Sequence, residues 1–190
     1  MDKKGFTILE ILVALTILVV VFTLITLLYV RAARTRNIIN AYNEVGEVLS
    51  QMIDIITNGR KGVLGLKDAG NICSQVNPPV SLDKYTLVFS DSTAKNTVIY
   101  QIKIKDTDRG ETSLYQNDVD LDLNKKVYLL SGSRFEYYDA NGRNIIDEKL
   151  NTETTLVRII LIGKATHPAM KKMVPMRIET SVRLKNKLSF

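Results

Sequence analysis

The sequence predicts an α+β fold in which one long N-terminal helix packs on an antiparallel β-sheet. Two observations predict it. Apolar residues are spaced for a helix up to Asn58, and no proline occurs before Pro78. Beyond residue 80, apolar and polar residues alternate with the two-residue period of a strand. The chain has 190 residues, 45% of them hydrophobic, which is enough for one domain with a core and an appended segment.

The first half of the expected helix is apolar on all sides. Residues 11–30 contain no charged side chain, no glycine and no proline, and Arg31 ends the run. Twenty helical residues span about 30 Å, the thickness of the hydrocarbon core of a bilayer. We therefore expect a transmembrane span at about residues 8–30. A cleaved secretory signal is the alternative, but its apolar region is normally shorter and ends at a small-residue cleavage site, and no convincing site follows here.

The second half of the expected helix is amphipathic. Its apolar residues recur at steps of three and four: Ile38, Ile39, Tyr42, Val45, Leu49, Met52, Ile53 and Ile56. Asn58-Gly59 is a helix stop, so the sequence predicts a helix over residues 6–58 and a β-rich domain over 59–190. Within that domain, residues 59–80 indicate a loop-rich connection.

Alternating or β-branched runs predict the strands of the sheet. The expected segments are 85–89, 98–104, 127–130, 155–163 and 174–184. "TLVRIILIG" at 155–163 is nearly continuous in apolar residues, as a central strand would be. Asn141-Gly142 is a strong hairpin signal after the aromatic run "FEYY".

Glu10 is an acid at the start of the apolar run, where a carboxylate is costly unless it is paired. One interpretation is an interfacial carboxyl group that is neutralised by Lys3 and Lys4 or is simply protonated. The other comes from the surrounding pattern. "KKGFTILEILVALTIL" resembles the processing site of type IV prepilins and of the pseudopilins of type II secretion.

That resemblance implies a pilin-like fold and a leader peptide at residues 1–5. A prepilin peptidase would cut after Gly5, Phe6 would become the N-methylated first residue, and Glu10 would be the fifth residue of the processed chain. The new amine, with an ordinary pKa near 8, would pair with Glu10 of a neighbouring subunit in a filament. The implied partners are other pilin or pseudopilin subunits, which bind through the N-terminal helix, the peptidase and the membrane.

The resemblance also implies a location. The chain would cross the cytoplasmic (inner) membrane once, with the C-terminal domain outside, and would assemble into a periplasmic or surface filament. Charge favours the opposite orientation weakly, because two Lys or Arg residues precede the span and three follow it. We give the resemblance more weight than this margin of one charge.

Three later segments, "FEYYDANG", "LVRIIL" and "SVRLKN", resemble J-type minor pseudopilins and W-type minor pilins. Leu27 stands where many major pilins have a helix-kinking proline, and Cys73, the one cysteine, cannot form an internal disulfide. The expected function is a minor structural subunit that helps to initiate or cap filament assembly. The alternatives are a single-span envelope protein with a β-rich binding domain and a subunit of a DNA-uptake pilus.

Catalysis is not expected. The one histidine, His167, lies in a loop-like stretch, and neither a nucleophile motif nor a phosphate-binding loop occurs. No cofactor is expected either, except that Asp106, Asp108 and Glu111 could offer oxygen ligands to calcium. The ordinary interpretation of these acids is a solvated turn. A second acidic group, at 118, 120 and 122, is expected on one face of an extended segment.

The last quarter of the chain is basic. Its cations are Lys164, Lys171, Lys172, Arg177, Arg183, Lys185 and Lys187. Such a patch could contact phosphates, but Phe190 is the one aromatic residue near it, so a platform for stacking bases is missing. Nucleic-acid binding is therefore not expected, and a solvated face or pairing with an acidic segment of a neighbouring subunit is favoured.

Overall fold

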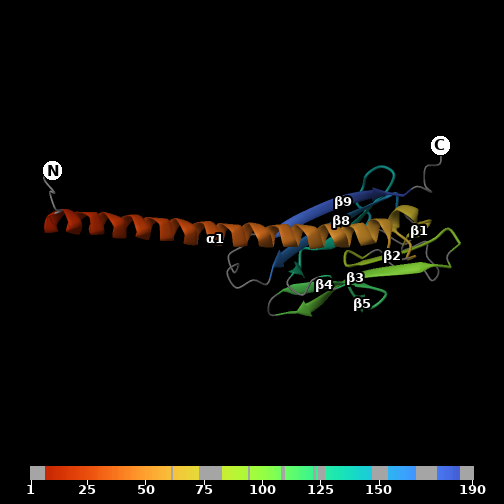
Figure 1. The fold of residues 1–190 in the computed structure, drawn as a ribbon. Coiled ribbons are helices and arrows are strands. Elements are labelled where there is room, and N and C mark those ends of the chain that lie inside the picture. The colour runs from red at the N-terminus through yellow and green to blue at the C-terminus, as the bar shows by residue number, and fades with distance from the viewer. Residues whose placement is uncertain are drawn as a thin grey trace. The chain divides into compact units, whose positions relative to one another are not determined.

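The computed structural model describes residues 7–60, 62–72, 83–93, 95–107, 110–121, 123, 127–146, 154–165 and 175–184. The chain forms two compact units, Met1–Asn40 and Ala41–Phe190. One helix, α1 (Ile8–Asn58), supplies all the described helical residues of the first unit and the first element of the second (Figure 1). The predicted α+β class, with a long N-terminal helix and an antiparallel sheet, is confirmed.

The helix ends where the Asn58-Gly59 pair predicted. Gly59 has φ +75°, and its N–H donates to the Ile55 carbonyl at 3.0 Å. A Cβ at this position would lie 2.1 Å from the Val63 carbonyl oxygen, so both the left-handed backbone and the close approach of the chain require glycine.

After α1 the described residues form a short 3-10 helix, η1 (Leu66–Asp68), and nine strands. The strands are β1 (Asn71–Ile72), β2 (Thr86–Ser90), β3 (Thr97–Asp106), β4 (Glu111–Gln116), β5 (Val119–Asp120), β6 (Val127–Leu130), β7 (Arg134–Tyr138), β8 (Leu156–Ala165) and β9 (Met176–Arg183). The five predicted strand segments correspond to β2, β3, β6, β8 and β9. The alternation did not predict β1, β4 and β5.

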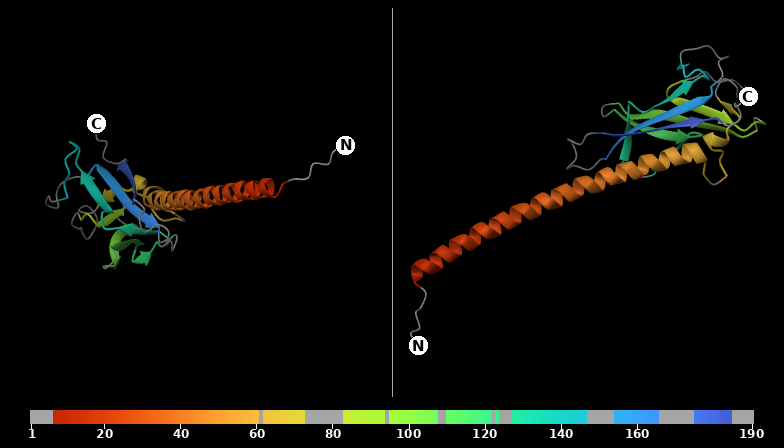
Figure 2. Two further views of the ribbon diagram at one scale, coloured as in Figure 1. Left: turned by 90° about the vertical axis from the view of Figure 1, so that its left-hand side faces the viewer. Right: turned by 90° about the horizontal axis from the view of Figure 1, so that it is seen from above.

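All described strand pairs are antiparallel, in the order β1-β2-β3-β4-β6-β8-β7, with β5 beside β4 and β9 beside β8. Figure 2 shows the strands from two further sides. β8 is central, as its apolar run predicted. Along one of its edges β7 pairs with Leu156–Ile160 and β6 with Gly163–Ala165, while β9 pairs along the other edge.

The last turns of α1 pack on this sheet within the second unit. Their buried residues are Ala41, Val45, Val48, Leu49, Met52, Ile55, Ile56 and Thr57. Leu49 packs tightly against β8, because a Cβ on Gly163 would lie 2.9 Å from its Cδ2. The predicted stripe began too early: Ile38 and Ile39 are 40% and 52% exposed, and burial begins at Ala41. Both isoleucines belong to the first unit, so the buried stripe is confined to the second.

Aromatic residues fill the centre of the sheet domain. Phe89 and Tyr100 are fully buried and stack with ring centroids 5.9 Å apart. The Tyr100 hydroxyl donates to the Ile55 carbonyl of α1 at 3.3 Å, and burial raises the pKa of this phenol to about 12. The aromatic core therefore joins β2 and β3 to the helix.

One predicted turn differs from its expected form, and a second turn occurs where an extended segment was expected. Asn141-Gly142 does form a tight turn after β7, but the returning segment makes a single bridge, Tyr138 with Asn144, among the described residues. The second turn is Asn117-Asp118, with φ of 48° and 65°, which links β4 to β5 in a two-residue hairpin. Asp118 therefore does not share an extended face with Asp120, contrary to the sequence prediction.

Candidate functional site

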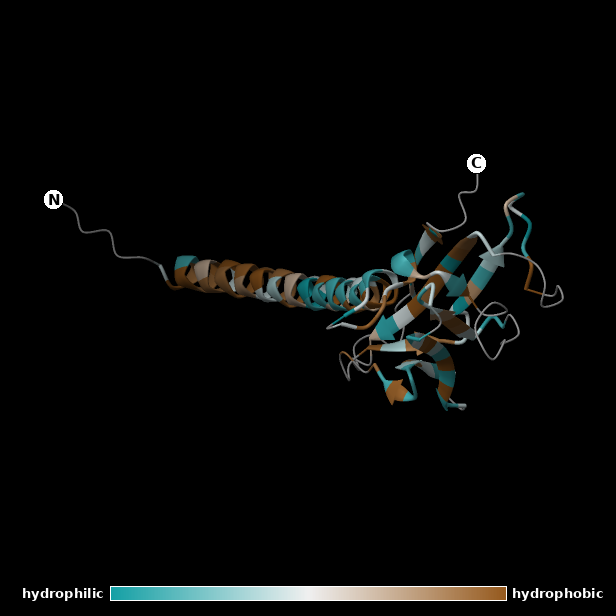
Figure 3. Cartoon of the chain, turned by 90° about the vertical axis from the view of Figure 1, so that its right-hand side faces the viewer, coloured by the Kyte–Doolittle hydropathy of each residue, from teal (hydrophilic) through white to brown (hydrophobic). Residues whose placement is uncertain are grey.

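The helical residues up to position 40 are exposed on all sides. From Ile8 to Val30 the helix is almost uniformly apolar, and the polar character begins near the arginines that follow (Figure 3). By length and composition α1 is able to cross a membrane, and none of its most apolar window is buried by the protein itself. This apolar surface fits lipid or other apolar helices far better than water.

Three threonine hydroxyl groups of the apolar stretch are satisfied by the helix itself. Thr16, Thr23 and Thr26 each donate to the carbonyl four residues earlier at 2.8 Å. In hydrocarbon an unpaired hydroxyl is costly, so these bonds let the segment carry threonines inside the predicted span.

Glu10 has a structural partner that the sequence interpretation missed. The Thr7 N–H donates to Glu10 Oε2 at 2.8 Å, the Thr7 hydroxyl donates to the same oxygen at 3.0 Å, and the Glu10 N–H donates to the Thr7 hydroxyl at 3.3 Å. This reciprocal arrangement is a capping box of the Thr-x-x-Glu type. It was readable in "TILE", because threonine followed three residues later by glutamate before an apolar run predicts it.

The capping box fixes the direction of the Glu10 carboxylate. One of its oxygens, Oε2, is occupied at the first turn of α1, and no described group bonds to Oε1. The helix dipole also favours a negative charge at this N-terminus. Gly5, Phe6, Lys3 and Lys4 lie outside the described residues, so the predicted processing site and the alternative cation partners stay predictions.

The predicted calcium ligands are only partly visible. Asp106 and Glu111 lie opposite each other where β3 turns into β4, beside a β-bulge, and Asp108 lies outside the described residues. The described portion of the chain holds no group of three or more acidic, histidine or cysteine side chains that could bind a metal. The calcium hypothesis stays a prediction.

Two of the three acids in the second acidic segment form ion pairs within the sheet, and Asp122 lies outside the described residues. Lys103 Nζ lies 2.7 Å from Asp118 Oδ1, and Lys105 Nζ lies 3.5 Å from Asp120 Oδ2. Both lysines come from β3, two residues apart, so the two ion pairs lie in succession along one side of the strand. The acidic residues of this hairpin thus have partners within the chain.

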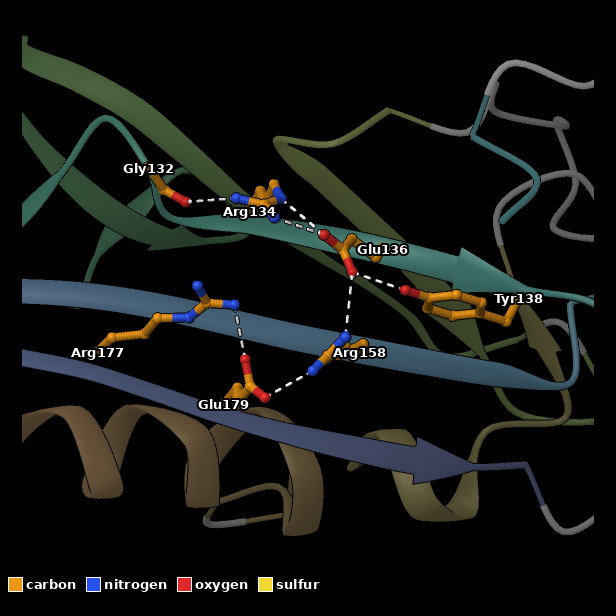
Figure 4. Close-up of polar contacts among 7 residues, drawn as sticks. All are labelled: Gly132, Arg134, Glu136, Tyr138, Arg158, Arg177 and Glu179. Carbon is orange, nitrogen blue, oxygen red and sulfur yellow. Dashed lines mark hydrogen bonds and ion pairs between the residues drawn. The ribbon is translucent and has the colours of Figure 1, made fainter. Parts of the chain in front are cut away.

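A buried carboxylate on the face of the sheet away from α1 was not predicted. Glu136 of β7 is 8% exposed; its Oε1 accepts from Arg134 at 2.8 and 2.7 Å, and its Oε2 accepts from the Tyr138 hydroxyl at 2.8 Å (Figure 4). Burial alone raises the pKa of this carboxyl, but the hydrogen bonds from Tyr138 and Arg134 and the charges of Arg134 and Arg158 together hold it below its usual value.

The ion pairs continue across the sheet to β9. Arg158 of β8 lies 3.9 Å from Glu136 and 2.6 Å from Glu179 Oε1, and Arg177 lies 2.7 Å from Glu179 Oε2 (Figure 4). Ile160, whose neighbours in register are Arg134 and Glu179, is 1% exposed on this face. The sequence signal was a charged or polar residue at every second position of "RFEYY" and "MRIETSVR".

The remaining candidate residues are divided between described and undescribed segments. Arg177 and Arg183 are exposed on β9, and Lys164 lies on β8. The other predicted basic residues, Lys171, Lys172, Lys185 and Lys187, lie outside the described residues, as do His167 and Cys73.

Comparison with known proteins gives one match. Residues 1–26 match the family described as the prokaryotic N-terminal methylation motif. No curated protein and no solved structure matches the chain. The match covers Gly5, Phe6 and Glu10 and most of the apolar run, and it does not extend to the sheet domain.

Proposed function

Because its N-terminal segment makes this chain a type IV prepilin-like protein, we propose that it is a minor structural subunit of a membrane-anchored type IV pilus or type II secretion pseudopilus, where it helps to initiate or cap filament assembly. The observation that carries the proposal is the methylation motif at residues 1–26, which includes most of an exposed apolar stretch of α1. Such a helix needs either lipid or other helices around it. The membrane supplies lipid before assembly, and the filament supplies the helices of other subunits after assembly.

The minor role is supported by the sheet domain. The segments "FEYYDANG", "LVRIIL" and "SVRLKN", which resemble minor pseudopilins and minor pilins, lie on the neighbouring strands β7, β8 and β9. Two of them supply Glu136 and Arg158, which form an ion pair at the centre of the network. The resemblance therefore concerns one continuous region of the sheet.

Processing follows from the same proposal. A prepilin peptidase cuts after Gly5, Phe6 becomes the methylated N-terminus, and the chain crosses the inner membrane once with residues 59–190 outside. Intact-mass measurement and N-terminal sequencing of the membrane-extracted protein test this directly. A chain that starts at Phe6 and carries one methyl group is expected. An intact Met1 would indicate an unprocessed single-span envelope protein instead.

Glu10 is proposed to pair with the Phe6 amine of a neighbouring subunit during assembly. The capping box supports this role, because it directs the carboxylate while no described group bonds to Oε1. In lipid the isolated carboxylate is costly, whereas in the filament it gains a cation at the same depth. The pair thereby favours assembly in one axial register.

Three substitutions separate the helix cap from the assembly charge. Glu10→Gln keeps a capping-box residue and removes the charge. Thr7→Ala keeps the charge and removes both hydrogen bonds of the Thr7 hydroxyl. Glu10→Ala removes the charge together with the two bonds to the carboxylate. If the charge acts in assembly, the Gln and Ala variants lose incorporation to a similar extent and Thr7→Ala retains it. The measurement is crosslinking to the other filament subunits, normalised to membrane-fraction abundance. Loss of incorporation by Thr7→Ala alone would show that the cap, not the charge, is what assembly needs.

A further inference from the structure

Strand β9 leaves one of its two edges open among the described residues. Its inner edge pairs with β8 in an unbroken register from Leu156↔Arg183 to Gly163↔Met176. The Leu184 N–H donates to the Thr155 carbonyl at 3.0 Å in that same register. Because hydrogen-bonded pairs alternate in an antiparallel ladder, even-numbered residues of β9 bond to β8 and odd-numbered residues direct their N–H and C=O groups outward. The outward set is Arg177, Glu179, Ser181 and Arg183.

The outer edge of β7, on the other side of β8, is covered by other segments of the chain. On β7, the Phe135 N–H donates to the Lys84 carbonyl at 2.7 Å, and the Tyr137 carbonyl accepts from the Ile145 N–H at 2.9 Å. Those two residues are the ones that the alternation leaves unpaired by β8. The chain therefore covers the outer edge of β7, whereas no described segment pairs with that of β9.

A groove runs along the open edge between β9 and the last turns of α1. It has a volume of about 560 Å³ and is lined by Ile178–Val182 of β9, by residues of α1 that include Ile53, Asp54 and Thr57, and by Lys67 of η1. Asp54 and Lys67 add one charge of each sign to the lining. At one end α1 and β9 converge, since a Cβ on Gly46 would lie 3.3 Å from Met176 Sδ. Along the groove, the Thr57 hydroxyl is buried without a hydrogen-bond partner among the described residues.

The charged side chains along the open edge of β9 favour some partner segments over others. Glu179 is the one exposed acid among the outward residues, and both of its oxygens already bind arginines. Arg183 has no ion pair among the described residues, so the surface has an excess of positive charge. A second β9 pairing antiparallel over the full open edge would place Arg177 opposite Arg183, which like-charge repulsion disfavours.

We propose that the open edge of β9 binds an extended segment of a partner protein as one additional strand, whose side chains alternate between acidic residues and small apolar residues. The acidic residues lie beside Arg177 and Arg183 on the outer face, and the apolar ones lie over Ile53 and Val182 in the groove. The backbone bonds form with the four outward residues of β9. This is strand addition to a sheet edge, in which the backbone gives affinity and alternate side chains give specificity.

The test uses the full chain in detergent and a synthetic heptapeptide of alternating glutamate and valine, blocked at both ends. Site-resolved amide hydrogen exchange is measured by NMR with and without the peptide. The expected result is at least tenfold slower exchange at residues 177, 179, 181 and 183, with little change at 178, 180 and 182, whose amides are already bonded to β8. A lysine–valine heptapeptide is the charge control and is expected to give no protection.

Three variants test the backbone contacts and the charge separately. Ser181→Pro removes one outward N–H and leaves the β8 ladder intact, so it should abolish protection while the protein stays folded. Thr180→Pro is the matched control, because it removes an N–H that β8 uses and should destabilise the sheet. Arg183→Glu should weaken binding of the glutamate–valine peptide and strengthen binding of the lysine–valine peptide, as measured by amide protection.

The outcomes are distinct from those of the filament proposal, since neither processing nor assembly enters the measurement. Protection that is specific to the acidic peptide and lost in Ser181→Pro supports strand addition. Equal protection by both peptides would contradict the preference for acidic side chains. No protection at millimolar peptide would contradict strand binding at the edge of β9. If the chain dimerises and Ser181→Pro abolishes the dimer, the β9 edge binds a second copy of this chain. That result would overturn the proposal of an acidic partner segment.

Discussion

Residues 8–40 and residues 41–58 belong to one helix, yet they use their apolar side chains differently. In the N-terminal stretch, 8–40, every side chain is exposed, and Leu24 is 55% accessible. In the C-terminal stretch, 41–58, the side that faces the sheet is buried, and Leu49 is fully inaccessible. Helix propensity is similar in both stretches, so the difference lies in what covers the helix. The C-terminal stretch has its partner within the chain, and the N-terminal stretch needs lipid or other subunits.

The largest expected effect comes from removing the C-terminal stretch. A chain that begins at Arg34 keeps the buried side of α1 and should fold cooperatively, whereas one that begins at Gly59 should not. Burial of Val45, Leu49 and Ile56 alone contributes about 1.5–3 kcal/mol each, which together approaches the whole stability of a domain. Urea unfolding followed by circular dichroism measures this. Equal cooperativity in the two chains would contradict the docking of α1 on the sheet.

Substitution of one leucine in each stretch tests the same difference in burial within the intact helix. Leu49→Ala should lower the free energy of unfolding of the sheet domain by about 2–5 kcal/mol, because it leaves a cavity against β8. Leu24→Ala is the matched control in the exposed stretch and should leave this transition unchanged. The measurement is the urea midpoint and slope of both variants in detergent. A destabilisation of the sheet domain by Leu24→Ala would show that the two stretches do not behave separately.

The contact between Leu49 and Gly163 allows the packing of the C-terminal stretch on β8 to be tested at a single position. Gly163→Ala should cost about 1–3 kcal/mol, since its Cβ would lie 2.9 Å from Leu49 Cδ2 and the core would be overpacked. In the Leu49→Ala background the added methyl group has room, so its cost should fall. A double-mutant cycle by urea unfolding measures the coupling. Additive effects would mean that strain in the β8 backbone, not Leu49, resists the methyl group.

The smallest expected effect concerns polar groups. The threonines of the N-terminal stretch are satisfied by their own helix, whereas Glu136 depends on side chains from its own and a neighbouring strand. Its pKa is below the ordinary value of 4.5, so its contribution to stability is present above about pH 5 and is lost as the pH falls through the folded-state pKa. Glu136→Gln should therefore make the urea midpoint less sensitive to pH between about 6 and 3.

The control for this experiment is Glu47→Gln, which removes one carboxylate from the exposed side of α1 and leaves the ion-pair network intact. The wild-type pH dependence should persist in that variant. If Glu136→Gln unfolds with the wild-type pH dependence, then other carboxylates control the acid transition.

The sequence by itself determined the elements whose signals are local. Helical spacing and the Asn58-Gly59 stop predicted α1 to its last residue, and alternation predicted five strands within a few residues. The Thr7–Glu10 capping box was equally local and could have been predicted, because its signal lies within four residues. The methylation motif, confined to residues 1–26, was also readable from the sequence alone.

The tertiary structure alone decided which strands meet and which side chains their register brings together. Ile160 is buried on the charged face because Arg134 and Glu179 flank it from strands that are distant in sequence. The open edge of β9 and the covered edge of β7 likewise depend on long-range pairing. Periodicity reports only the two faces of a strand, whereas the neighbour on each edge is set by the packing of the whole sheet, and no signal within a few residues carries that information.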